Sequence, residues 1–126
     1  MGRLGDGFLG SYQPPEDAGK AVCAIRQAAE EYQRVVPEDH YGTIVPFHFG
    51  DEDISAEIAT LMKRINPRSS FETYAAWRTP DAVLRCIDAF VEVGITKFVM
   101  RPMISGPTMH DQFVRLAELV VPRYHD

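Results

Sequence analysis

Apolar residues recur at helical spacing in four segments of the chain. The first segment starts at Pro14 and Pro15, because proline suits the first turn of a helix. The second ends before Pro67, which cannot continue a helix. Thr79 and Gly94 delimit the third as an N-cap and a C-terminal stop. The apolar positions, in chain order, are Ala18, Val22, Ile25, Ala29 and Tyr32; Ile54, Ile58, Leu61, Met62 and Ile65; Val83, Ile87, Phe90 and Val91; and Phe113, Leu116, Ala117, Val120 and Val121. We therefore expect four helices, each with one buried face.

Three shorter apolar runs have the composition of buried strands. They cover residues 7–12, 42–49 and 95–101. Pro46 lies inside the second run, and because proline cannot donate to a sheet ladder we expect a bulge or a strand end there. Residues 68–77 fit either a helical turn or a packed loop. The predicted order is strand, helix, strand, helix, helix, strand and helix.

This alternation of strands with amphipathic helices predicts an α/β fold with a parallel sheet built from βαβ units. An independent α/β domain usually has more than three strands. A sheet this narrow exposes strand edges and leaves its helices partly uncovered. We therefore expect self-association, or a partner chain that supplies the rest of the fold.

The composition is that of an ordinary globular protein, and it argues against several kinds of partner. The 126 residues are 45% hydrophobic and 25% charged, with a formal net charge of −5. An acidic chain with no basic cluster cannot neutralise phosphates, so no nucleic acid is expected as a partner. No apolar run reaches the ~20 residues that span a bilayer, and the first residues have no signal-peptide core. We expect a cytoplasmic protein that does not bind membranes.

The two cysteines, Cys23 and Cys86, are far apart in the sequence. They have no CxxC spacing and no histidine at ligand distance in sequence, so they predict neither a metal site nor a redox motif. We expect two reduced thiols in or near the core.

Several short motifs occur in an order that resembles one enzyme family. The chain opens with Arg-Leu-Gly-Asp-Gly-Phe at residues 3–8, and the first helix contains Arg-Gln-Ala-Ala-Glu-Glu-Tyr at residues 26–32. Arg-Thr-Pro-Asp at residues 78–81 precedes the third helix, and Val-Gly-Ile-Thr-Lys-Phe-Val-Met-Arg-Pro at residues 93–102 follows it. Together these motifs resemble luciferase-like monooxygenases and related deazaflavin-dependent oxidoreductases over essentially the whole chain. Arg78 departs from the pattern, because the family usually has glycine there.

The resemblance implies a (β/α)8 TIM barrel. Residues 1–126 would be its C-terminal segment, about the last three strand–helix units. Residues 7–12 would form the sixth strand, 42–49 the seventh and 95–101 the eighth. Either the chain is part of a longer barrel protein, or it completes a barrel with another polypeptide, a complementing N-terminal barrel chain.

The resemblance also implies a flavin- or deazaflavin-dependent oxidoreductase, of monooxygenase or hydride-transfer type, that acts on a small organic substrate. The residues present do not distinguish FMN from a deazaflavin coenzyme. The family's phosphate-binding residues lie largely on the fourth and fifth strand loops, and no glycine-rich phosphate loop replaces them here. We therefore expect weak cofactor binding by this chain alone. The alternative function is a catalytically inert α/β fragment that serves as an interaction or oligomerisation module.

Candidate site residues follow from the rule that the active site of such a barrel lies at the carboxyl ends of the strands. Arg101 could hold an anionic group of the cofactor or substrate, or it could form an ion pair with a carboxylate such as Asp6. His48 is the candidate catalytic residue, for proton transfer or for a hydrogen bond to the cofactor ring; the alternative is a structural histidine.

Three residues around the first strand complete the predicted cofactor-binding set. Gly7 recurs at this place in the family and allows close packing or an unusual backbone angle. Ser11 could hydrogen-bond a ligand or solvent. Phe8 could stack on a cofactor ring, or it could belong to the core with Phe47 and Phe49.

Overall fold

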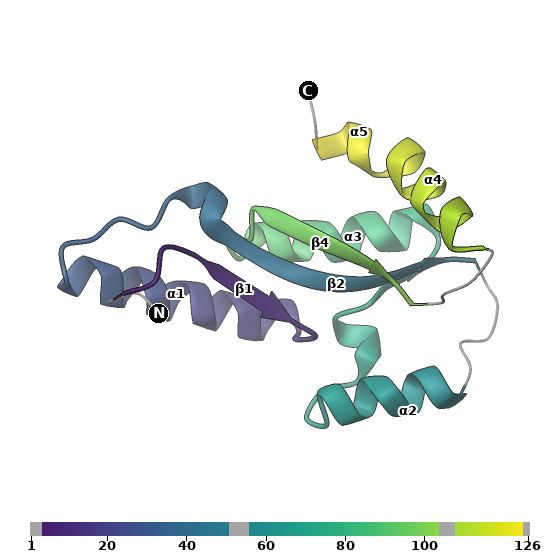
Figure 1. Cartoon of the computed structure of the whole chain (residues 1–126), viewed down its shortest axis with the longest axis horizontal. Helices are drawn as coiled ribbons and strands as arrows, with labels where there is room; N and C mark the ends of the chain where they lie inside the picture. The colour runs from purple at the N-terminus through teal and green to yellow at the C-terminus, as the bar shows by residue number, and fades with distance from the viewer. Residues whose placement is uncertain (1–3, 51–55, 104–107, 125–126) are drawn as a thin grey trace.

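The computed structural model describes residues 4–50, 56–103 and 108–124, which form a parallel sheet with helices packed mainly on one side (Figure 1). The elements in chain order are β1 (Phe8–Ser11), α1 (Pro15–Glu31), η1 (Glu38–His40), β2 (Tyr41–Phe49), α2 (Ala56–Ile65), η2 (Phe71–Thr73), β3 (Ala76–Arg78), α3 (Pro80–Glu92), β4 (Lys97–Pro102), α4 (Met109–Leu119) and α5 (Val121–Tyr124). The predicted α/β alternation is confirmed. Ile54, expected in the second helix, lies outside the described residues.

Strand β2 is the centre of the sheet. β1 pairs with Tyr41–Ile44 of β2, β3 pairs with Phe47–Phe49, and β4 pairs with Gly42–Phe47, all in the parallel direction. The strand β3 was not predicted. It lies at the end of residues 68–77, for which the sequence allowed either a helical turn or a packed loop. The helical turn is present as η2.

The bulge or strand end expected near Pro46 is not found, because β2 runs through this position without a break. Proline is tolerated in a sheet only where no neighbouring strand needs its missing N–H. β1 pairs with β2 only as far as Ile44, and β3 pairs only from Phe47 onwards. The Phe47 carbonyl accepts a hydrogen bond from Met103, just after β4, so the adjacent Pro46 faces the opposite edge, in the gap between β1 and β3.

One face of the sheet is buried beneath the helices, and we call it the core face. Successive residues of a strand point to opposite faces. The core-face residues of β2 are each no more than 2% exposed: Tyr41, Thr43, Val45, Phe47 and Phe49. The helix residues buried with them are Ala18, Val22, Ile25 and Ala29 of α1 and Val83, Ile87 and Phe90 of α3, all as predicted. Tyr32 was expected among them, but it is 55% exposed because α1 ends one residue earlier.

Helix α3 begins and ends where its sequence signals predict. The Thr79 hydroxyl accepts a hydrogen bond from the backbone N–H of Ala82 at 3.1 Å, which satisfies a donor at the first turn. Gly94 has a φ of 101°, a conformation that residues with a Cβ rarely adopt, and the chain reverses there into β4. α3 also packs closely on α1, because a Cβ at Gly19 would lie 3.0 Å from the Cβ of Val93.

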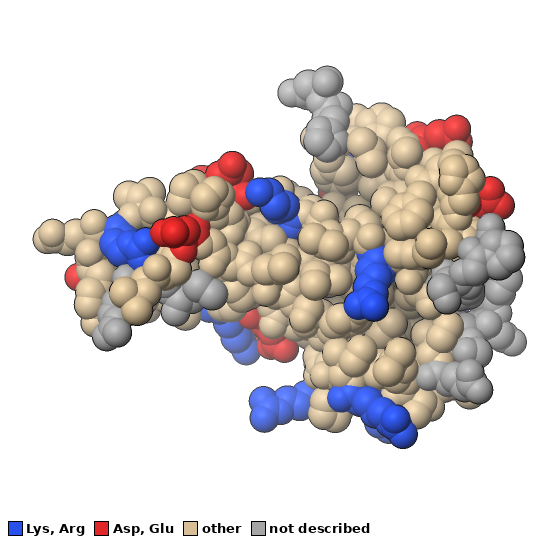
Figure 2. All heavy atoms as spheres, in the orientation of Figure 1, with Lys and Arg blue, Asp and Glu red and all other residues tan. Residues whose placement is uncertain are grey.

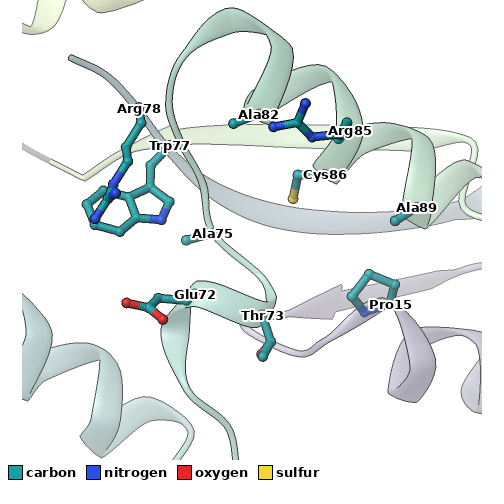
Figure 3. Close-up of a pocket in the computed structure, with 10 residues that line it drawn as sticks. All are labelled: Pro15, Glu72, Thr73, Ala75, Trp77, Arg78, Ala82, Arg85, Cys86 and Ala89. Atoms are coloured by element: carbon teal, nitrogen blue, oxygen red, sulfur yellow. The ribbon is translucent and has the colours of Figure 1, made fainter. Parts of the chain in front are cut away.

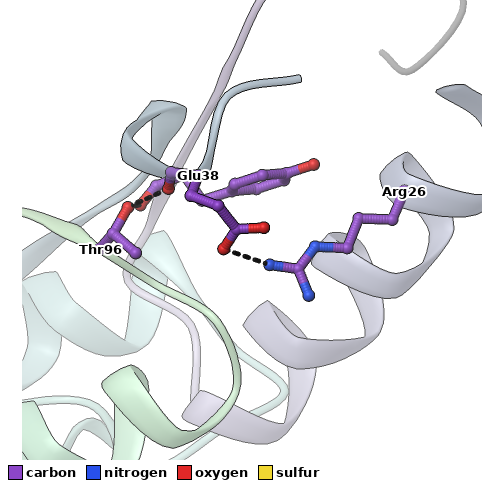
Figure 4. A network of polar contacts seen from close by, with 4 residues as sticks. Arg26, Glu38 and Thr96 are labelled. Carbon is purple, nitrogen blue, oxygen red and sulfur yellow. Dashed lines mark hydrogen bonds and ion pairs between the residues drawn. The ribbon is translucent and has the colours of Figure 1, made fainter. Parts of the chain in front are cut away.

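Polar contacts join the amino ends of the strands to the end of α1 (Figure 4). Arg26 forms an ion pair with Glu38 at 3.1 Å, and its guanidinium carbon lies 5.2 Å from the ring centroid of Tyr41. The Thr96 hydroxyl donates to the carbonyl of Glu38, and the Thr96 backbone N–H donates to the carbonyl of Tyr41 at 2.8 Å. These contacts fix η1 and the start of β4 relative to α1.

The other face of the sheet, which we call the open face, is only partly covered by the described residues, because Pro46 and His48 of β2 are buried there whereas the flanking strands are exposed. Its residues at consecutive register positions are Leu9, Ser11, Ile44, Val99 and Arg101. Leu9 is 58% exposed and Val99 is 46% exposed. In Figure 1 this face is in front of α1 and α3, and the same view in Figure 2 shows few charged side chains over the sheet.

Three further helices also expose residues that the pattern predicted to be buried. Leu61 and Ile65 of α2 are 52% and 44% exposed, so only part of the expected apolar face of this helix is covered. Val91 of α3 is 45% exposed and Phe113 of α4 is 43% exposed. α4 ends at Leu119, and a separate short helix, α5, contains Val121, which is 39% exposed. Apolar surface is therefore left uncovered both on the open face and beside β4.

Candidate functional site

Three predicted site residues project from the same side of the sheet near the carboxyl ends of the strands. The register places Ser11 beside Ile44 and Arg101 beside Pro46, and His48 follows two residues later on β2. Side chains at paired positions of parallel strands lie on one face, so Ser11, Arg101 and His48 share a face. Parallel α/β sheets bind their ligands outside the carboxyl ends of the strands. This region is therefore the candidate site.

Arg101 is exposed and does not pair with Asp6. The guanidinium of Arg101 donates to the hydroxyl of Tyr12 at 3.1 Å. Asp6 instead accepts from Arg34 at 2.8 Å, at the opposite end of the sheet. Among the described residues no carboxylate lies within ion-pair distance of Arg101, and its side-chain hydrogen bond there goes to the Tyr12 hydroxyl. A guanidinium in this state is available to a carboxylate or phosphate.

Tyr12 is a site residue that the sequence did not single out. It has a φ of 52°, a left-handed conformation that costs a residue with a Cβ roughly 1–2 kcal/mol. Its carbonyl accepts a hydrogen bond from Asn66 at 2.8 Å, and its ring meets that of Tyr74 edge to face, with centroids 6.2 Å apart. The only signal in the sequence was its position, directly after a strand and before Pro14. These contacts hold the hydroxyl beside Arg101.

Tyr74 supports this arrangement from the core. It is 1% exposed, and its hydroxyl donates to the carbonyl of Met62 at 3.3 Å. Burial, with a smaller contribution from Tyr12, raises the pKa of Tyr74 above its ordinary value of 10.0. The phenol therefore stays neutral at physiological pH, and it acts as a fixed wall for Tyr12.

His48 is buried, with 3% of its surface exposed. Its register partner is Trp77 of β3, the single tryptophan of the chain. The flanking residues Phe47 and Phe49 belong to the core face. A ligand would have to approach His48 from the carboxyl end of β2.

Gly7 and Phe8 lie at the amino end of β1, away from the other three predicted site residues. Phe8 pairs with Tyr41, the first residue of β2, and it packs against the hydrophobic core. A Cβ at Gly7 would lie 3.0 Å from the carbonyl oxygen of His40, so close backbone packing accounts for the glycine. The structure thus divides the predicted cofactor-binding set between the two ends of the sheet.

Arg78 ends β3 with a φ of 85°, the left-handed region that glycine adopts without strain. The resembled motif has glycine at this position, and the backbone conformation explains that preference. In this chain the guanidinium carbon of Arg78 lies 4.2 Å from the ring centroid of Trp77. A stacked cation of this kind was not predicted from the sequence.

The helices that begin at the carboxyl ends of β1 and β3 have few free N–H groups for a phosphate. Phosphate sites at helix N-termini use backbone N–H donors, and proline has none. α1 is preceded by Pro14 and starts at Pro15, and α3 starts at Pro80. The N–H of Ala82 in α3 already donates to its N-cap. Among the described residues there is also no group of three or more His, Cys, Asp or Glu side chains that could hold a metal ion.

Comparison of the sequence with known protein families and with curated proteins finds no match. Several solved structures are similar in fold, including these three. An F420-dependent secondary alcohol dehydrogenase, in complex with an F420-acetone adduct, has a TM-score of 0.75 at 13% identity over 99% of this chain. The monooxygenase RslO1 from Streptomyces bottropensis has a TM-score of 0.70 at 17% identity over 98% of the chain. The coenzyme F420-dependent tetrahydromethanopterin reductase from Methanopyrus kandleri has a TM-score of 0.63 at 18% identity over 98%.

The chain spans less than half the length of each of these proteins: 44%, 44% and 47%. At such low identities the likeness shows the fold alone. The mixed α/β arrangement with its parallel sheet therefore matches one part of the fold of these oxidoreductases and monooxygenases. None of the described helices is both long and apolar enough to span a membrane.

Proposed function

We propose that this chain is the C-terminal portion of a flavin- or deazaflavin-dependent oxidoreductase, with its three strand–helix units forming the last part of a (β/α)8 barrel. The reaction would be of the monooxygenase or hydride-transfer type on a small organic substrate, in the cytoplasm. The observation that carries this proposal is the likeness in fold, which extends over 98–99% of this chain but less than half of each similar protein.

The exposure of the open face supports the proposal that other residues, outside the described sheet, complete a barrel. The inner face of a small barrel is filled by side chains from all its strands. Leu9 and Val99 are apolar and about half exposed. Apolar side chains on both faces of a strand are typical of strands that are buried on both faces. A complementing N-terminal barrel segment, on the same polypeptide or on another, would cover them.

A deazaflavin-type coenzyme is the cofactor we favour, because two of the three similar structures are described as F420-dependent. The polar groups at the carboxyl ends fit the ring of such a cofactor. Arg101 carries a positive charge that no described carboxylate neutralises, and Ser11 has an exposed hydroxyl on the same face. When bound, a deazaflavin supplies hydride transfer, and a flavin supplies either hydride transfer or oxygen activation.

The chain's own residues would bind and orient the reactants. Arg101 holds an anionic edge of the cofactor or substrate, and Tyr12 fixes the direction of that guanidinium. Ser11 offers a hydrogen bond beside it. His48 holds or moves a proton at the carboxyl end of β2, where its burial excludes bulk water.

The cofactor's phosphate would be held mainly by residues outside this chain. The proline-rich starts of α1 and α3 provide few free N–H donors, and Gly7 and Phe8 lie at the far end of the sheet. Binding by the isolated chain should therefore be weak. Weak cofactor binding by the isolated chain distinguishes this proposal from one in which the chain alone is a complete flavoprotein.

Cofactor fluorescence tests the proposal. The chain would be titrated with FMN and with coenzyme F420, first alone and then after mixing with the first five strand–helix units of an F420-dependent barrel. We expect little binding to the chain alone and saturable binding to the mixture, stronger for F420. Arg101→Met should weaken that binding about tenfold or more, because a charge-assisted contact is lost. Arg115→Met, at an exposed arginine of α4, is the matched control.

A second candidate function is a catalytically inert module that associates through its apolar surfaces. Leu9 and Val99 on the open face and Val91 on α3 favour it, because exposed apolar surface marks association sites. Binding of neither cofactor, with or without the N-terminal barrel half, would favour this alternative over the enzyme.

A further inference from the structure

A pocket of about 480 Å³ lies between the η2–β3 segment and α3, on a part of the molecule that the proposed function does not use (Figure 3). Its volume is in the range of small-molecule sites. Trp77 and Arg78 lie at one end, Arg85 and Cys86 come from α3, and Glu72 lies on the wall formed by η2. We call it the β3–α3 pocket.

Arg78 is held in place although its backbone is strained. Its φ of 85° is a conformation that a residue with a Cβ rarely adopts. Its guanidinium stacks on one side of the Trp77 ring at 4.2 Å, and the ring of Phe71 packs against the same indole with centroids 5.5 Å apart. Stacking fixes the plane of the guanidinium and leaves its N–H groups without a hydrogen-bond partner among the described residues. A pre-oriented donor fork therefore faces the pocket.

Arg85 adds a second positive charge without a described counterion. It is exposed and lines the pocket, and Ala89, four residues later, lies on the same face of α3. No carboxylate of the described residues lies within 4.0 Å of Arg78 or Arg85, and Glu72 in the same pocket pairs with neither.

The remaining walls are apolar apart from Thr73. Pro15, Ala75 and Ala89 line the pocket, and the Cys86 side chain points into it. Burial raises the pKa of the Cys86 thiol to about 11, so it is neutral at physiological pH and serves as an apolar surface. The pocket thus combines two guanidiniums, one from the end of β3 and one from α3, with walls that are mostly apolar.

We propose that the β3–α3 pocket binds a small carboxylate with an apolar body. Arg78 and Arg85 bind the carboxylate, and the apolar walls contact the rest of the ligand. Glu72 disfavours a second negative charge on the η2 side, so the ligand is a monoanion. This site is separate from the open face with Arg101, and it does not depend on the oxidoreductase proposal.

Trp77 is the single tryptophan, so its fluorescence reports on this pocket. The 126-residue chain would be titrated with benzoate, with the neutral isostere benzyl alcohol, and with inorganic phosphate. We expect a saturable change in Trp77 fluorescence with benzoate. The affinities for benzyl alcohol and for phosphate should be at least tenfold weaker. Benzyl alcohol binding as tightly as benzoate would overturn the role of the arginines. Phosphate binding as tightly would overturn the role of the apolar walls.

Two variants test the roles of Arg78 and Arg85 and should leave the fold intact. Arg78→Gly removes the guanidinium and relieves the strained φ, and Arg85→Gln removes a charge from the exposed side of α3. Each should weaken benzoate binding at least tenfold, whereas Arg115→Gln on α4 should leave it unchanged. Equal benzoate affinity in the wild type, Arg78→Gly and Arg85→Gln would overturn the proposal, as would the absence of saturation in the wild type.

Discussion

The two faces of β2 carry similar residues but have different surroundings. On the core face, Val45 and Phe47 are fully buried beneath the helices. On the open face, Ile44 is only partly buried, and its neighbour Val99 is 46% exposed. Both faces carry apolar residues, but on the open face the described residues bury Pro46 and His48 and leave the flanking strands exposed at Leu9 and Val99. A sheet that is apolar on both faces is typical of parallel sheets with a layer on each side.

This difference indicates that the sequence is suited to a sheet with a second covering layer. An exposed apolar side chain forgoes the roughly 1.5–3 kcal/mol that its burial contributes. The open face and the uncovered sides of α3 and α4 include several such side chains: Leu9, Val99, Val91 and Phe113. The rest of the proposed barrel would bury those on the open face, and a second copy of the chain would cover either surface.

The largest expected difference between the faces concerns stability. Phe47→Ala removes a fully buried ring that contacts the rings of Phe49 and Phe113, and it should lower the free energy of unfolding by about 3–5 kcal/mol. Val99→Ala on the open face should cost less than about 1 kcal/mol. Urea unfolding followed by circular dichroism measures both. Similar losses for the two variants would mean that the faces are equally buried.

A smaller effect is expected where α4 holds the end of β2. Gln112 is 5% exposed; its side chain accepts from the N–H of Phe49 at 2.7 Å and donates to the carbonyl of Phe49 at 3.0 Å. Gln112→Ala leaves two buried backbone groups unpaired, so we expect a loss of about 2–4 kcal/mol. Gln27→Ala, on the exposed side of α1, should change stability by less than about 0.5 kcal/mol. Equal unfolding midpoints for the two variants would contradict this role for Gln112.

The same contrast between covered and exposed positions applies to the two thiols. Cys23 is exposed, whereas burial raises the pKa of Cys86 from its ordinary value of 9.0 to about 11. Near neutral pH the thiolate fraction of Cys86 should therefore be about 100-fold below that of an ordinary thiol. Alkylation rates in Cys23→Ser and Cys86→Ser measure each thiol separately. Equal rates would show that Cys86 is not protected.

The raised pKa of Cys86 also predicts a pH dependence of stability. The unfolded thiol ionises near pH 9, and the folded thiol only near pH 11. Its contribution to stability is complete below about pH 9 and is lost progressively as the pH rises towards 11. In Cys86→Ser this part of the alkaline loss should disappear from the unfolding profile.

Long periodic segments could be predicted from the sequence, whereas short or strained ones could not. The helix Pro80–Glu92 was predictable because Thr79, Pro80 and Gly94 are strong signals. β3 was missed because three residues carry no periodicity, and its pairing depends on the distant Phe47–Phe49. The continuity of β2 at Pro46 depends on where β1 stops and β3 starts, which no local pattern contains.

The candidate site was predictable only in part for the same reason. The rule that sites lie at the carboxyl ends of parallel strands was enough to select Ser11, His48 and Arg101, but the register that puts them on one face came only from the structure. Tyr12 was missed as a partner of Arg101, because its left-handed φ redirects the side chain. Gly7 and Phe8 were grouped with the site from the family resemblance, but their register places them at the amino end of the sheet.

Sedimentation velocity over a range of concentrations tests most directly whether the open face is an uncovered interface. We predict that the 126-residue chain associates as its concentration rises, and that Val99→Lys on the open face shifts it towards monomer. Val35→Lys, at a residue that is 89% exposed beyond α1, should leave association unchanged. A wild-type chain that stays a single, folded monomer at every concentration would contradict the account.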